Sequence, residues 1–106
     1  MSFLAAELSL DLIRAMREPL VVIRRHDADE AKQTRRSLNS VARNIAEAGG
    51  RFGRDRLQAF SIAYGSLRET RAALDIAVAN GWLAENPPAA AVAFRLGGLL
   101  YRLSGH

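Results

Sequence analysis

The sequence of 106 residues has no cysteine, only two histidines and three prolines, and few aromatic side chains. The absence of cysteine excludes disulfides and thiolate metal sites, and it fits the reducing cytoplasm, where we expect the protein to reside. His26 and His106 are not spaced as a ligand pair, so we expect neither a metal site nor a cofactor. No apolar run approaches the roughly 20 residues of a membrane span. The N-terminal segment carries Glu7 and Asp11 where a signal peptide would be basic.

Positive charge is concentrated in the middle of the chain. The formal net charge is +4, whereas the segment 32–56 alone has seven basic and two acidic residues, a net charge of +5. Such a patch is typical of proteins that bind phosphate backbones, but a solvated helix face with intersubunit ion pairs would have the same composition. On the first interpretation, the nucleic-acid contacts are Lys32, Arg36, Arg43, Arg51, Arg54 and Arg56.

Apolar periodicity predicts four helices, and the first two are separated near Asp27. The first covers about 3–25 and contains Pro19, which removes a backbone hydrogen bond. Two outcomes are open, a split at Glu18 or a kink, and we favour the kink because the apolar pattern continues past the proline. The second covers about 28–48. We expect Asp27 and Glu30 to form a capping box at its start and Gly49-Gly50 to end it.

The last two predicted helices are rich in surfaces for packing. The third, about 55–80, has one stripe of large apolar residues and a second stripe of small residues. The small residues are Ala59, Ala63, Ser66, Ala73 and Ala77. The fourth, about 87–103, should begin with Asn86 as cap and Pro87 at the first helical position, and it is apolar around much of its circumference. These two features predict assembly with further copies of the chain. The predicted fold is all-α, an antiparallel up-down-up-down four-helix bundle forming one domain over 1–106.

Two local features bear on phosphate binding. On the second helix, Lys32, Arg36, Ser40 and Arg43 are predicted to form one solvent-facing ridge. Between the second and third helices lies a Gly/Arg elbow, 49–54. It is open to two interpretations, a phosphate-wrapping loop or a tight helix–helix turn, and we favour the turn because the P-loop pattern is missing.

The middle of the chain resembles a known family. The patterns S-V-A-x-N-I-A-E at 40–47 and F-x-I-A-x-G-S-x-x-E at 60–69, together with the elbow, are similar to those of the 23S rRNA intervening-sequence proteins. That family includes the accessory variability determinants of diversity-generating retroelements. The resemblance covers about 8–83 and implies a four-helix bundle that assembles into a ring of five. It also implies RNA and a reverse transcriptase as partners in the retroelement branch. The family's N-I-A-E-G reads N-I-A-E-A-G here, which predicts a helix one residue longer.

The residues that match the polar positions of the family motif are Asn44, Glu47, Ser66 and Glu69. A functional interpretation would pair Glu47 with Glu69 as an acid/base couple or hard-metal site. We favour a structural one, in which these side chains cap backbone groups and pair with arginines at the junction of the second and third helices. No nucleophile–base set is visible, so we expect no enzyme. Tyr64 and Tyr101 are predicted to be core or interface aromatics.

Two functional hypotheses follow from these observations. The first is an oligomeric RNA-binding or nucleic-acid-binding module that uses the basic surface. The second is a protein–protein scaffold or accessory subunit whose arginine-rich surface meets an acidic partner, such as a reverse transcriptase.

Overall fold

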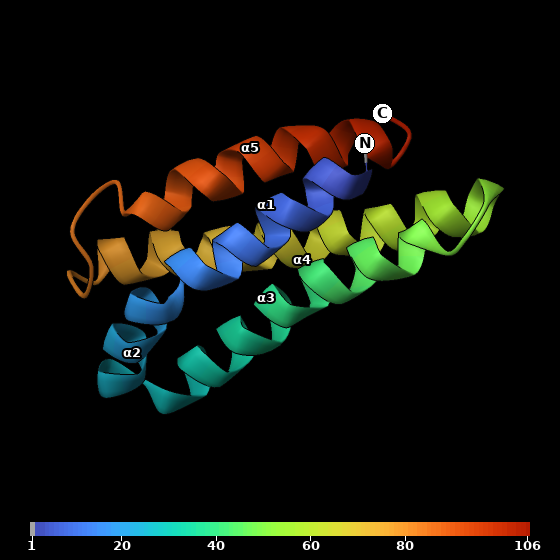
Figure 1. Cartoon of the computed structure of the whole chain (residues 1–106). Coiled ribbons are helices and arrows are strands. Elements are labelled where there is room, and N and C mark those ends of the chain that lie inside the picture. Colours follow the sequence, from blue (N-terminus) through green and yellow to red (C-terminus); the bar gives the residue numbers. More distant parts are fainter. Residues whose placement is uncertain (1) are drawn as a thin grey trace.

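Five α-helices form the computed structural model, which describes residues 2–106 (Figure 1). In chain order they are α1 (Ser2–Ala15), α2 (Arg17–His26), α3 (Ala28–Gly49), α4 (Gly53–Ala79) and α5 (Pro88–Leu103). The prediction of an all-α fold is confirmed, and no strand occurs in the described residues. The predicted number of four helices is corrected to five, because the first predicted helix is two. The molecule is elongated, with principal extents of 42 × 23 × 20 Å.

The first predicted helix is broken at Met16, where we expected a kink at Pro19. Proline has no N–H to donate to the carbonyl of Ala15, and its ring crowds that same carbonyl, so the helix is interrupted one turn before the proline. Pro19 becomes the third residue of α2, a position whose N–H needs no partner within the helix. The chain turns through Met16, whose N–H donates to the Leu12 carbonyl at 2.9 Å.

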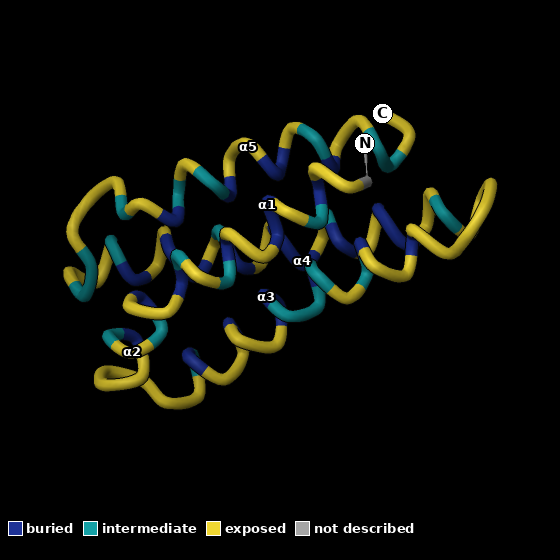
Figure 2. Tube along the Cα trace, viewed as in Figure 1, coloured by how far each residue is buried: buried dark blue, intermediate teal, exposed yellow. Residues whose placement is uncertain are grey.

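The four longer helices enclose one core. α1 and α4 each pack against both α3 and α5, so that α3 and α5 lie diagonally across the molecule, and α2 lies against α3. Figure 2 shows the buried residues of these helices turned toward the shared interior. The largest side chains of this interior, all with an exposed fraction below 2%, include Leu12, Met16, Ile45, Phe60, Leu67, Leu96 and Leu100. The apolar stripes predicted from the sequence therefore converge on a common core.

The small-residue stripe of α4 faces α3 of the same chain. Ala59, Ala63, Ser66, Ala73 and Ala77 are all buried. Small side chains allow two helix backbones to approach closely, and hydrogen bonds from α4 to α3 mark this seam. The expectation that the stripe receives a helix from another copy is thus wrong, because α3 already occupies it.

Most helix ends follow local sequence signals. The Asp27 cap is confirmed, since the Glu30 N–H donates to Asp27 Oδ1 at 3.0 Å, but the Asp27 N–H donates to the Ile23 carbonyl, so the capping box is not reciprocal. α3 ends at Gly49 as predicted, and α4 begins at Gly53, two residues earlier than predicted.

The cap predicted at Asn86 is wrong. Pro88 is the first helical residue of α5 and Pro87 precedes it as the N-cap. Asn86 lies in the left-handed region with a φ of 55°, which asparagine tolerates better than most residues. The two consecutive prolines shift the helix start by one position, because Pro88 disfavours helical geometry at Pro87, which is extended with ψ 148°. In the part of the chain that the structure describes, no helix has the length and apolar character needed to cross a membrane.

Candidate nucleic-acid interface

The outward face of α3 carries a row of exposed cations. Lys32, Arg36 and Arg43 are separated by four and seven residues, which places them on one side of the helix, opposite its buried residues. Lys32 and Arg43 are about 16 Å apart along the helix axis at 1.5 Å per residue. No acidic residue occurs between Ala31 and Ala46. Over three turns, this face of α3 therefore presents positive charge only. We call Lys32, Arg36 and Arg43 the α3 ridge.

The α3 ridge is electrostatically unpaired within the chain. Among residues 2–106, ion pairs within 4.0 Å are recorded for Arg14 with Asp11 and for Arg51 with Glu47, and the three ridge side chains make neither an ion pair nor a hydrogen bond. Neighbouring Arg35 is also exposed. The acidic residues of α3 are instead gathered at its ends, at Asp29 and Glu30 in the first turn and at Glu47 near the last. The cations are free to meet an external anion.

Ser40 does not belong to the ridge, contrary to the prediction. It lies about 80° around the helix from Lys32 at 3.6 residues per turn, and its side chain faces α4. Ser40 Oγ is 2.8 Å from Ser66 Oγ of α4. Asn44 Nδ2 donates both to Ser40 Oγ, at 3.1 Å, and to the backbone carbonyl of Ser40, at 2.9 Å. Asn44 and Ser66, two of the four family-motif residues, thus meet through a serine that we had assigned to solvent.

A second hydroxyl pair lies deeper in the same seam and was not predicted. Ser37 Oγ is 3.0 Å from Thr70 Oγ1, and both residues are buried. Each hydroxyl is also bonded to a carbonyl of its own helix, that of Thr34 for Ser37 and that of Ser66 for Thr70. The signal was present in the sequence, because Ser37 and Ser40 on α3 and Ser66 and Thr70 on α4 recur at helical spacing on the seam side.

The other two motif residues, Glu47 and Glu69, lie far from each other. Glu47 accepts from Arg51 Nε at 2.9 Å at the end of α3, as the structural interpretation predicts. Glu69 is exposed and precedes Thr70, the α4 residue that lies opposite Ser37 of α3. On α3, Ser37 is ten residues before Glu47. That register separates the two carboxylates by about 15 Å along the helix axes. The acid/base or metal pair of Glu47 with Glu69 is therefore ruled out. No cluster of His, Asp or Glu suited to a metal ion occurs among the described residues.

α2 carries three further exposed arginines. They are Arg17, Arg24 and Arg25, and α2 packs against α3. Sequence reasoning left them out of the candidate contacts because the segment 1–31 has a net negative charge, which hides three cations on one short helix. The packing of α2 on α3 brings these cations near the helix that carries the α3 ridge.

The remaining predicted cations lie at the elbow, which is a tight turn of three residues between α3 and α4. Gly53 has a φ of 55°, a conformation that glycine adopts without strain. Arg51 is paired with Glu47, Arg54 is exposed, and Arg56 lies over the Phe60 ring at 5.4 Å. The six predicted contacts thus form two groups, the α3 ridge and the elbow.

The outward face of α5 has a different character. Phe94 is 70% exposed with Arg71 above its ring at 5.9 Å, and Tyr101 is 48% exposed. Tyr101 contacts the rings of Tyr64 at 5.8 Å and His106 at 4.6 Å. Tyr64 packs against the core as predicted, whereas Tyr101 is at the surface, so a core position is wrong for Tyr101 and a place between copies stays a prediction. Neighbouring α1 adds further exposed apolar side chains, Phe3, Leu4 and Leu10.

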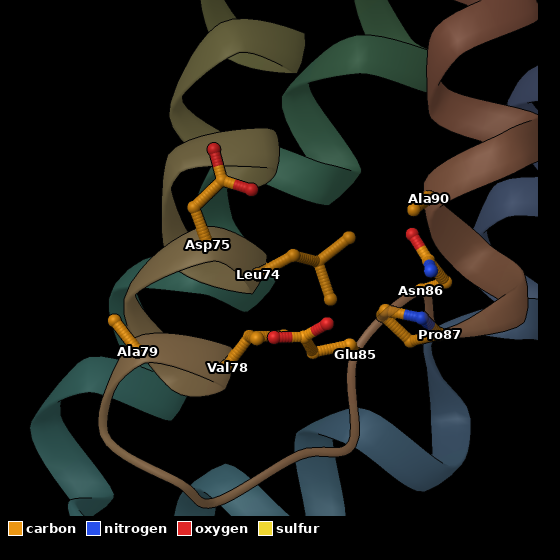
Figure 3. Close-up of a pocket in the computed structure, with 8 residues that line it drawn as sticks. All are labelled: Leu74, Asp75, Val78, Ala79, Glu85, Asn86, Pro87 and Ala90. Atoms are coloured by element: carbon orange, nitrogen blue, oxygen red, sulfur yellow. The ribbon is translucent and has the colours of Figure 1, made fainter.

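Hollows on the surface are lined by residues of little catalytic potential. The one in Figure 3, about 310 Å³ in volume, lies between the C-terminal part of α4 and the start of α5. Its apolar wall includes Leu74, Val78 and Pro87, and its carboxylates are those of Asp75 and Glu85. No serine, lysine, cysteine or histidine lines it, so it offers no nucleophile–base pair.

Comparison with known proteins gives a family and a fold. The family model described as 23S rRNA-intervening sequence protein matches residues 5–90. The structure is similar to the crystal structure of a protein with unknown function from the S23 ribosomal protein family of Bacteroides thetaiotaomicron, with a TM-score of 0.83 and 20% identity over 96% of this chain and 99% of that one. No curated protein sequence matches. The agreement over nearly the full length extends the shared fold beyond the matched motifs, and the chain belongs to the 23S rRNA-intervening sequence protein family.

Proposed function

We propose that this protein is a non-enzymatic module that binds nucleic acid, and RNA in particular, through the α3 ridge. The observation that supports this most directly is the exposed, acid-free and unpaired row of cations on α3. Phosphate binding releases counterions from the nucleic acid, and only cations that are not already neutralised by the protein contribute fully. Arginine, which supplies two of the three ridge cations, presents a planar fork suited to phosphate oxygens.

The proposal includes assembly of several copies into a ring, as the family resemblance implies. Support comes from the exposed apolar residues of α1 and α5, of which α5 lies diagonally across the bundle from α3 and α1 lies between the two. If copies associate through α1 and α5, the α3 ridges remain on the outside of the assembly. Several weak sites on one particle then bind a long RNA with an avidity above that of one site.

We further interpret the architecture as an antiparallel four-helix bundle to which α2 is added. In this description α1, α3, α4 and α5 are the four members and α2 is an extension that widens the basic side. The short connections between α3 and α4 and between α4 and α5 favour antiparallel neighbours.

The experiment is binding of a labelled structured RNA, duplex DNA and heparin at low and physiological salt. The test variant carries Arg36→Glu and Arg43→Glu. A matched control carries Ser61→Glu, Arg68→Glu and Ala72→Glu, three exposed positions on one side of α4 that change the net charge by the same amount as the test variant. We expect the α3 variant to lose RNA binding and the α4 variant to keep it, with wild-type circular dichroism in both.

Two results would contradict the proposal. Equal losses in both variants would reduce the interaction to net charge. Binding that disappears at physiological salt, or that heparin matches, would favour the alternative, an acidic protein partner such as a reverse transcriptase, which copurification with the candidate partner then tests.

A further inference from the structure

The tip of the elbow exposes an aromatic ring. Phe52 has an exposed fraction of 87%, the highest among the exposed large hydrophobic residues of the described chain. It belongs to the turn that joins α3 to α4, and Figure 1 shows this turn at one end of the molecule. Packing within the chain therefore does not explain why a phenylalanine occupies this position.

The turn holds the Phe52 backbone in a defined place. The N–H groups of Gly50 and Arg51 donate to the carbonyls of Glu47 and Ala48 at 3.1 and 3.2 Å, which closes the end of α3. Phe52 then precedes α4 in an extended conformation, with φ −132° and ψ 157°. A turn fixed in this way on both sides presents the ring with little loss of backbone freedom on binding.

Arginines flank Phe52 in the sequence, with one acidic residue, Asp55, in the first turn of α4. Arg54 follows two residues later and is exposed, with no hydrogen bond or ion pair in the described chain. Arg51 precedes the ring, although Glu47 already neutralises it. The elbow thus combines a flat apolar face with an available cation one turn or less away, which matches the two parts of a nucleotide, a base with a π face and a phosphate.

The area of the exposed Phe52 ring indicates which kind of partner can cover it. A stable contact between two copies buries about 800 Å² on each partner, whereas one exposed ring offers about 200 Å². A nucleobase is comparable to one ring, and its charged phosphate complements Arg54. The ridge residues of α3 reach paired or unpaired RNA alike through phosphates, but a ring stacks only on a base that is not inside a duplex.

We propose that Phe52 and Arg54 form a contact for one unpaired nucleotide of an RNA, with the base stacked on Phe52 and an adjoining phosphate bound by Arg54. The inference rests on the proposed function, since the α3 ridge provides the general attraction to the backbone. The elbow adds a preference for single-stranded segments.

The test measures affinity for a short unstructured RNA and for the same RNA annealed to its complement. Phe52→Leu keeps an apolar side chain but removes the aromatic face, and we expect it to weaken binding of the single strand about tenfold and to leave the duplex unchanged. Phe52→Trp should retain the affinity, and its fluorescence should be quenched by the single strand. Arg54→Gln should lower the salt slope for the single strand by about 0.7.

A matched control is Ile76→Ala, since Ile76 is an exposed apolar side chain near the other end of α4, and it should leave both affinities unchanged. Wild-type affinity of Phe52→Leu for the single strand would overturn the inference while leaving the proposed function intact. An equal loss for strand and duplex, or a change in the mass of the assembly, would overturn it in favour of a structural role or a contact between copies. Failure of the wild-type protein to bind either RNA would overturn both proposals.

Discussion

The outward faces of α3 and α5 differ in what they offer to another molecule, although both belong to helices of similar environment. Each of these helices packs against α1 and α4, and each buries one side in the same core. On the outside, α3 presents Lys32, Arg36 and Arg43, whereas α5 presents Phe94 and Tyr101. Core packing determines which positions of a helix point outward, but it leaves the residue types there unconstrained. Those types therefore carry the information about partners.

The inner faces differ in the same sense. α3 turns hydroxyl groups of Thr34 and Ser37 inward, where they are hydrogen-bonded, while α5 buries alanine, glycine and leucine. The buried side of the basic helix thus combines apolar side chains with hydrogen-bonded hydroxyls, whereas the buried residues recorded for α5 are all without polar side chains. The predictions below test whether these roles are separable.

The largest effect on stability is expected from a substitution in the core that α3 and α5 share, because it removes packing from both helices. Leu67 of α4 is fully buried in the core between the two helices. Leu67→Ala removes buried methyl groups and leaves a cavity, which should lower the free energy of unfolding by about 2–5 kcal/mol. Urea denaturation measures this. Ile62→Ala on the exposed side of α4 is the control and should change stability by no more than about 0.5 kcal/mol. Similar losses of unfolding free energy in the two variants would show that Leu67 does not lie in a continuous core.

Removing the charge of the α3 ridge should affect one face only. In the variant Lys32→Gln/Arg36→Gln/Arg43→Gln, three phosphate contacts are lost, and the log–log slope of affinity for single-stranded RNA against salt should become shallower by about two. Fluorescence anisotropy across a salt series gives the slope. Light scattering should find the assembly unchanged, and a dispersed assembly would mean that the ridge lies at a contact between copies.

The converse change concerns the face of α5. Phe94→Glu replaces an exposed ring with a charge, and if the ring is buried between copies, its loss should weaken the assembly by about tenfold or more, since burial of such a side chain contributes about 1.5–3 kcal/mol. Sedimentation velocity over a concentration series measures this. An unchanged mass distribution would exclude the α5 face from the assembly, as would a wild-type protein that is monomeric.

The smallest effect is expected inside the α3–α4 seam. Thr70→Val removes one hydroxyl, but Ser37 Oγ keeps its bond to the Thr34 carbonyl, so no buried polar atom is left without a partner. The expected loss is about 1 kcal/mol in thermal or urea unfolding. Thr70→Ala, which also removes a methyl group, is the comparison and should cost more. A loss above about 3 kcal/mol for the valine variant would indicate that the hydroxyl network acts as one cooperative unit.

Much of the helical structure was predictable because its signals are local. Asp27 caps α3 through a side chain three residues from its donor, and Gly49-Gly50 ends the helix without help from elsewhere. The break at Met16 was harder to place, because the effect of Pro19 falls on the carbonyl of the preceding turn. The start of α5 was misplaced for a similar reason, since Pro88 acts on the residue before it, Pro87.

The candidate interface was predictable where it follows one helix and obscured where it crosses between helices. The spacing of Lys32, Arg36 and Arg43 was enough to place them outward. Ser40 was misassigned because its neighbour across the seam, Ser66, is 26 residues away in sequence. Arg24 on α2 comes near the basic helix α3 only through packing that no local pattern encodes.

The arrangement of α1 has a consequence for how the protein is made. α1 packs against α3 and α5, and α5 is the last helix of the chain. During synthesis, α3 and α4 can pair as soon as both have left the ribosome, because a turn of three residues joins them. Leu8 and Leu12 of α1, translated earlier, lack the side of the core that α5 contributes until translation has passed Leu100. α1 therefore emerges before α3, α4 and α5 but is sheltered only after α5 has emerged, and in the interval its apolar residues are accessible to chaperones that bind such segments.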